Sequence, residues 1–168
     1  DLHWMVHSFP TRRSSDLLVR MLGMRRTMFV VPSDLVALVQ RSSSDAVAAR
    51  LRAALIKDLT AVVQAPGAWL ADVEGSVHEL VRTTGGSPAT ALSTAEPRLR
   101  TKLVYAEGKA YGGSSTITTR VLNLMAADGL IVRGRTKGAW TGAQYEWGPI
   151  ESWFPNGPHS YWAPVQAP

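Results

Sequence analysis

Hydrophobic residues recur every three to four positions in several stretches of the chain, the spacing that places them on one face of an α-helix. The longest of these stretches predict amphipathic helices over residues 45–63, 69–84 and 114–128. Shorter helices are expected where a polar cap or a glycine stop flanks apolar residues, over 18–22, 33–41 and 87–92. The run of serines at 42–44 predicts a break between the helices on either side of it.

Shorter apolar or alternating runs predict β-strands. They cover residues 28–31, 99–105, 130–133 and 140–147. Gly and two cations fill the segment 134–138, which predicts a turn that joins the last two strands into a hairpin.

The order helix, short helix, helix and hairpin over residues 69–150 predicts an α+β, mostly α-helical fold: a winged helix-turn-helix with a C-terminal β-hairpin wing. Pro66-Gly67 reads as a linker, so residues 18–64 are expected to be part of a second winged-helix unit that precedes it. Residues 151–168 are rich in proline and predict an irregular tail.

Charge is distributed unevenly along the 168 residues, whose formal net charge is +5. Residues 98–140 carry eight Arg and Lys against only Glu107 and Asp128, a net charge of +6 within one segment. A positive surface on a predicted helix and its neighbouring hairpin favours an acidic partner, and we expect double-stranded DNA.

Polar and basic side chains of the predicted recognition helix and wing are the candidate DNA contacts. On the helix, Ile117, Val121, Leu124 and Met125 define the packed side, and the polar residues fall on the opposite one. The predicted DNA-binding residues are Thr116, Thr119, Arg120 and Asn123 on the helix, with Arg133, Arg135, Lys137 and Trp140 on the wing. Trp140 is either a surface for stacking on DNA or a core residue that packs against Tyr145.

Several classes of chemistry find no support in the sequence. The chain has no Cys and its four His residues lack metal-ligand spacing, so we expect no metal and no cofactor. No P-loop or G-x-S-x-G pattern is present, and no catalytic residue can be named. No apolar run is long enough to cross a bilayer, which predicts a cytoplasmic protein that does not use a membrane.

Residues 1–17 show neither helical nor strand periodicity. The string HSFPTRRSSDL at 7–17 resembles a translated sequencing-adapter oligonucleotide, which makes this stretch an expected sequence artefact. The alternative is a disordered N-terminus in which Ser15 or Asp16 caps the next helix.

Two blocks of the chain resemble bacterial winged helix DNA-binding domain-containing proteins. The first is LVRMLGMRRTMFVVP at 18–32, and the second runs from Ser115 to Trp147 and includes DGLIVRGR and QYEW. That family contains DNA glycosylases, built from tandem winged helices, that remove bulky alkylated bases and unhook interstrand crosslinks. The resemblance implies a fragment of a DNA-repair protein that binds DNA.

In those glycosylases a Gln-x-Gln or Gln-x-Asp motif near the N-terminus positions the attacking water. That region would lie upstream of Leu18, so this fragment is expected to bind DNA without catalysis, even if its parent is an enzyme. Gln144-Tyr145-Glu146 has similar spacing but falls in the wing, and the catalytic role is not transferred to it. Two alternatives remain open: a winged-helix transcriptional regulator without enzymatic activity, and a winged module that binds protein.

Overall fold

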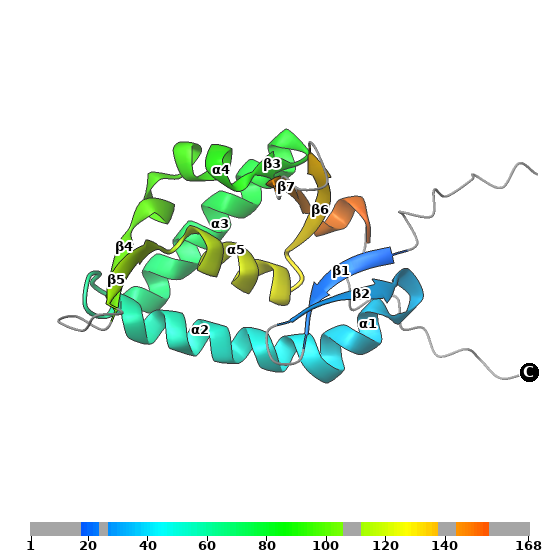
Figure 1. The fold of residues 1–168 in the computed structure, drawn as a ribbon, viewed down its shortest axis with the longest axis horizontal. Helices are drawn as coiled ribbons and strands as arrows, with labels where there is room; N and C mark the ends of the chain where they lie inside the picture. Colours follow the sequence, from blue (N-terminus) through cyan, green and yellow to red (C-terminus); the bar gives the residue numbers. More distant parts are fainter. Residues whose placement is uncertain (1–17, 24–26, 106–111, 138–143, 155–168) are drawn as a thin grey trace, which may run out of the picture.

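The computed structural model describes residues 18–23, 27–105, 112–137 and 144–154 (Figure 1). The N-terminal elements are β1 (Leu18–Leu22), β2 (Met28–Pro32), the 3-10 turn η3 (Ser33–Leu35), α1 (Val36–Val39), the π-helical turn η4 (Gln40–Ser44) and α2 (Asp45–Leu59). The elements that follow are α3 (Pro66–Thr84), β3 (Ser87–Pro88), α4 (Ala89–Ala95), η5 (Pro97–Arg100), β4 (Lys102–Tyr105), β5 (Gly113–Thr116), α5 (Thr118–Ala127), β6 (Ile131–Lys137), β7 (Gln144–Pro149) and η6 (Ile150–Ser152). The fold is α+β and mostly helical, as the sequence predicts.

The first element is a strand, and the helix predicted over 18–22 is wrong. β1 pairs antiparallel with β2, with Val19 opposite Val31 and Met21 opposite Phe29. Val19 and Met21 are buried whereas Leu18 and Arg20 are exposed, the alternation of a strand with one packed face. A segment of five residues, four of them apolar, is too short for periodicity to separate helix from strand, and only the pairing with β2 decides it.

No break separates the helices on either side of residues 42–44, contrary to the prediction. The chain passes from α1 through the π-helical turn η4 directly into α2. Ser44 is fully buried and its hydroxyl donates to the Leu22 carbonyl at 2.8 Å. Gln40 is buried as well, and its amide donates to the Ala127 carbonyl at 2.7 Å. Both polar side chains therefore bond to distant parts of the fold, which is why they do not end the helix.

The main hydrophobic core lies between α2, α3 and α5. Leu55 and Leu59 of α2 meet Leu70 and Val77 of α3 and Leu124 of α5, and all five are at most 1% exposed. A second cluster joins the β1–β2 hairpin to β6 and the segment after β7, formed by Val19, Met21, Val31, Val36, Val132, Ile150 and Phe154. Residues from both predicted units, 18–64 and 69–150, therefore contribute to the same main core. The boundaries between the two units remain a prediction.

A three-stranded antiparallel sheet has the order β3–β7–β6. β6 continues to Lys137, so the turn predicted to begin at Gly134 is wrong for residues 134–137; Gly138 lies outside the described residues. The register shifts between Arg133 and Thr136. A Cβ at Gly134 would lie 3.2 Å from the Glu146 carbonyl oxygen, so glycine accommodates the close approach of β7 at this irregularity.

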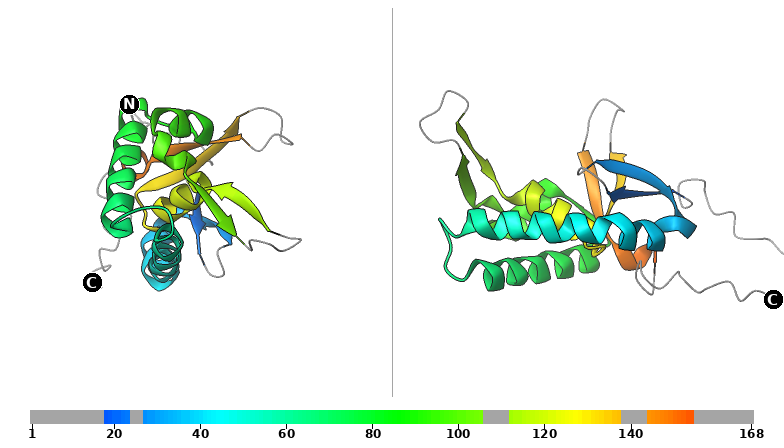
Figure 2. Two further views of the ribbon diagram at one scale, coloured as in Figure 1. Left: turned by 90° about the vertical axis from the view of Figure 1, so that its left-hand side faces the viewer. Right: turned by 90° about the horizontal axis from the view of Figure 1, so that it is seen from below.

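A second hairpin, β4–β5, precedes α5 and was not predicted. The helix therefore begins at Thr118 instead of Ser114 or Ser115, and Thr116 belongs to β5. The serine-rich strand has no hydrophobic alternation, which is why the sequence pattern missed it. The β4–β5 and β6–β7 hairpins project from the same side of the molecule, with α5 between them and α3 on the opposite side (Figure 2).

Candidate nucleic-acid interface

Helix α5 lies at the centre of the candidate interface. Its predicted packed side is confirmed, because Val121, Leu124 and Met125 are fully buried, as is Ile117 immediately before the helix. Leu122 is also fully buried, although it falls outside the predicted stripe. Helix α5 is covered on several sides, by α2, α4, β1 and β6, and the residues of α5 alone do not reveal these approaches.

The polar residues predicted on this helix have different surroundings. Thr119 is exposed and Asn123 is half-buried, and both line one pocket beside the β6–β7 hairpin. Arg120 lies towards α2 instead, where its guanidinium donates to the Asp58 carboxylate at 2.7 Å. Thr116 is exposed on β5. The structure therefore groups Thr119 with Asn123 and ties Arg120 to an acidic neighbour.

Arg133 of β6 stacks over the ring of Tyr145 from β7, with the guanidinium carbon 3.3 Å from the ring centroid. This cation–π contact fixes the side chain across the two strands. The Arg133 Nε is buried and has no hydrogen-bond acceptor among the described residues. A positive group with an unused donor is thus held in place at the edge of the sheet.

A pocket of about 330 Å³ lies between α4, α5 and the β6–β7 hairpin. Trp147, only 6% exposed, and Tyr145 contribute aromatic walls. Its remaining lining residues are Pro88, Ala89, Thr90, Thr119, Asn123 and Arg133. Predicted residues from the helix and from the hairpin, Asn123 and Arg133, therefore meet at a single site.

Three predicted residues lie partly or wholly outside the described part of the structure. Arg135 and Lys137 belong to strand β6, and their side chains lie outside the described part of the chain. Trp140 lies entirely outside the described residues. Their roles in DNA binding stay predictions.

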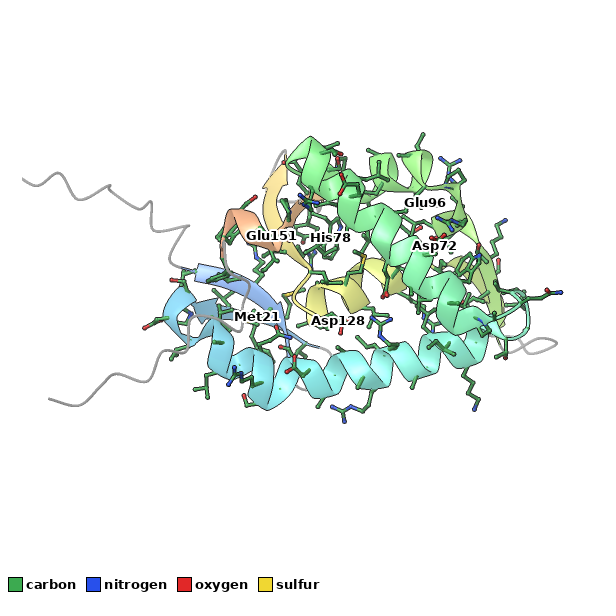
Figure 3. The ribbon with its side chains drawn as sticks, turned by 180° about the vertical axis from the view of Figure 1, so that it is seen from behind. Met21, Asp72, His78, Glu96, Asp128 and Glu151 are labelled. Atoms are coloured by element: carbon green, nitrogen blue, oxygen red, sulfur yellow. The ribbon has the colours of Figure 1, made fainter. Side chains whose placement is uncertain are left out.

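An ionic network fixes α5 relative to α2 and α3. Arg52 donates to Glu74 at 2.8 and 3.0 Å and to Asp128 at 2.5 Å. Glu74 is almost fully buried, and this burial raises its pKa, with the Arg52 contact opposing the rise. Hydrogen bonding to Glu74 raises the pKa of Arg52. Figure 3 shows Asp128 at the end of α5 facing α2, so the network joins all three helices.

A second ionic cluster holds the turn that leads from α4 into the β4–β5 hairpin. Arg98 contacts Glu96 at 2.8 Å and also Asp72 of α3 (Figure 3). Glu96 is 5% exposed, and hydrogen bonds from Arg98 lower its pKa to about 2. The base of the projecting hairpin is therefore anchored to α3 by the Arg98–Asp72 ion pair, and Arg98 is held in place by the Glu96 carboxylate, which is ionised at neutral pH.

Sequence reasoning missed several residues at this surface. The sequence indicated Tyr145 only as a packing partner for Trp140 and did not mark Thr90 or Trp147 as binding residues. Tyr145, Thr90 and Trp147 all line the pocket, whereas Trp140 itself lies outside the described residues. Val104 and Tyr105 of the β4–β5 hairpin are 65% and 53% exposed, unusual for large apolar side chains. The sequence signal for this surface was the concentration of Arg and Lys over residues 98–140. That concentration of charge does not identify the residues that line the pocket.

Within the described ranges, no cluster of His, Asp and Glu could hold a metal ion. No helix in that part of the chain combines the length and hydropathy required to cross a membrane.

Comparison with known proteins identifies a family. A family model described as DNA glycosylase AlkZ-like matches residues 10–167. No curated protein and no solved structure matches the chain. A DNA glycosylase-like protein has DNA as its partner and DNA repair as its setting. Because the match spans nearly the whole sequence, the chain belongs to the DNA glycosylase AlkZ-like family.

Proposed function

We propose that residues 69–150 form a winged-helix module that binds double-stranded DNA as part of a DNA-repair protein. Helix α3, strand β3, helices α4 and α5 and the β6–β7 hairpin follow one another in the order expected of that fold. In this proposal α5 is the recognition helix and the β6–β7 hairpin is the wing. The β4–β5 hairpin is an addition between the two helices of the helix-turn-helix.

One observation carries the proposal: the recognition helix and both hairpins occupy the same side of the molecule (Figure 2). Residues 98–140, the part of the chain that contains β4, β5, α5 and β6, hold a net charge of +6. A duplex placed against it would meet Thr119 and Asn123 of α5 and Arg133 of the wing. Amide and guanidinium groups contact base edges, and hydroxyls contact phosphates.

The β4–β5 hairpin extends this surface. Its exposed Val104 and Tyr105 are suited to the sugar edges and bases of a groove, and Lys102 is exposed at its base. Glu96 and Arg98 fix the position from which it projects. The hairpin and the wing would thus contact the duplex on the two sides of α5.

In this proposal the chain binds DNA and cleaves no bond. No catalytic group is assigned among the described residues, and Gln144-Tyr145-Glu146 lies in strand β7 of the wing. We propose that the chain is a fragment of a glycosylase-type repair protein. Family membership favours this reading over a transcriptional regulator.

Fluorescence anisotropy with a labelled random-sequence duplex tests the proposal. The wild-type chain should bind at low salt, and Asn123→Ala and Arg133→Ala should each weaken binding by about 5- to 100-fold. Arg82→Ala is the matched control, because Arg82 lies on α3, pairs with Glu79 and does not line the pocket between α4, α5 and the β6–β7 hairpin. Absence of binding by a folded wild-type chain, or equal losses in Arg82→Ala and Arg133→Ala, would overturn it.

A further inference from the structure

Strand β6 carries a bulge at the point where the wing meets the β1–β2 hairpin. Two residues of β6, Gly134 and Arg135, stand opposite the single residue Glu146 of β7. A bulge of this kind leaves one residue outside the ladder and bends the strand that carries it. The course of the wing beyond the bulge, residues 135–137, therefore depends on what holds the bulge in place.

Arg20 of β1 holds this bulge from outside the wing. Strand β1 passes beside β6 (Figure 1), and the Arg20 Nη1 donates a hydrogen bond of 2.9 Å to the Gly134 carbonyl, across 114 positions of the chain. Arg20 alternates along β1 with Val19 and Met21, whose buried side chains belong to the cluster that also contains Val132. The buried face of β1 thus fixes the strand, and its exposed face presents Arg20 to the wing.

Close packing does not extend to the outer edge of this contact. A cavity of about 200 Å³ lies between the exposed face of the β1–β2 hairpin and β6, with Leu18 and Val30 on one side and Val132 and Gly134 on the other. The aliphatic side chains on the two sides leave this space unfilled, so they do not hold the wing there by contact. The hydrogen bond from Arg20 links the two sides.

We propose that Arg20 is a positioning residue for DNA binding: by holding the Gly134 carbonyl it sets the direction in which the wing carries Arg135 and Lys137 to the DNA backbone. The inference rests on the proposed DNA-binding function and extends it to the β1–β2 hairpin, which lies outside residues 69–150. A wing already held in its binding direction is ordered before DNA arrives. Loss of the bond transfers that ordering cost to the binding step and lowers affinity.

Replacement of Arg20 tests the hydrogen bond. Arg20→Met keeps an aliphatic stem but cannot donate, and it should weaken binding to a random-sequence duplex by about 3- to 10-fold, the range of one net hydrogen bond. Arg20→Lys keeps a charged donor on a long stem and should recover most of the loss. Arg50→Met is the matched control, because Arg50 is also exposed and its Nε donates to the Ala46 carbonyl of its own helix. It should change affinity by no more than about twofold.

A double-mutant cycle shows whether Arg20 acts through the wing or contacts DNA itself. Arg20→Met should make the salt dependence shallower, from a slope of about −4.5 for five phosphate contacts towards about −2.7 for three. In a chain that carries both Arg135→Ala and Lys137→Ala, Arg20→Met should change neither slope nor affinity further, since the cations through which it acts are gone. A direct phosphate contact by Arg20 adds its own ~0.9 to the loss of slope in both backgrounds.

The outcomes separate this inference from the proposed function. Failure of the folded wild-type chain to bind the duplex overturns both. Equal losses in Arg20→Met and Arg50→Met, an unchanged salt slope in Arg20→Met, or additive losses in the cycle overturn the positioning role while DNA binding stands. The same holds if Arg20→Lys recovers nothing, or if Arg135→Ala with Lys137→Ala binds as tightly as wild type. Urea unfolding of each variant checks that the fold is retained.

Discussion

Arg120 of the proposed recognition helix is held by Asp58 of α2, with 2.7 Å between the guanidinium nitrogen and the carboxylate oxygen. Both side chains are partly exposed, at 37% and 49%, so the pair is accessible to solvent and to a ligand. Exposed pairs of this kind contribute ~0.2–1 kcal/mol to stability. The contact is therefore weak enough for a phosphate to replace the carboxylate.

Asp58→Asn should strengthen DNA binding. The change removes a negative charge beside the interface and releases Arg120, so affinity at low salt is expected to rise about 2- to 5-fold. Anisotropy titrations measure the effect. Adding Arg120→Ala to Asp58→Asn should cancel the gain, and a gain that persists would show that Arg120 does not contact DNA.

Salt should weaken binding with a slope set by the phosphate contacts. If about five cations each neutralise one phosphate, the logarithm of affinity falls with the logarithm of salt concentration at a slope of about −4.5. Replacing Arg135 and Lys137 together with alanine should reduce the slope to about −2.7, since each contact contributes ~0.9. Titrations between low and physiological salt check this, and an unchanged slope removes these two side chains from the interface.

Arg52→Ala should destabilise the fold by leaving the Glu74 carboxylate buried without its partner. Glu74 is only 7% exposed, and loss of one member of such a pair costs about 3–5 kcal/mol. Urea unfolding at pH 7 measures the loss. Arg52→Ala combined with Glu74→Gln should recover part of it, because the neutral amide has a smaller desolvation cost; no recovery would contradict a charge-based origin.

Stability should depend on the ionisation of Glu96 in acid. Its pKa is lowered to about 2 by the Arg98 hydrogen bonds, so the stabilisation is complete above its ordinary pKa of 4.5. It is lost as pH falls from there through about 2. After allowance for solvent around Arg98, Glu96→Gln should cost roughly 1–3 kcal/mol at pH 7. Urea midpoints of the two proteins should converge in acid, and a constant difference would contradict this origin.

The sequence predicted the long elements better than the short ones. The apolar stripes of α3 and α5 repeat over several helical turns and pack against the core as expected. Helix α2 ends at Leu59 instead of residue 63, so Val62 of its predicted stripe lies beyond the helix and is exposed, as is Ala54. β1 and β5 are five and four residues long, and neither was recognised as a strand. A short strand is defined by its partner, which lies across a turn and is not part of its own pattern.

The residues of the candidate site also fall into two groups, those that the sequence predicted and those whose contacts only the structure revealed. The sequence located Thr119, Asn123 and Arg133 as an approximate surface, from helical spacing and from the position of the wing strand. It missed that Arg120 is paired with Asp58, because the two are 62 positions apart in the chain. It also missed the pocket that Tyr145 and Trp147 form with α5.

By itself the sequence determined which faces are apolar, how the helices and the final hairpin follow one another, and where positive charge accumulates. These properties follow from side-chain type and local periodicity, which are fixed along the chain. Only the tertiary structure decided the partner of each charge and the walls of the pocket. Such contacts depend on the packing of α2 and the sheet against α5, and no local pattern encodes those distances.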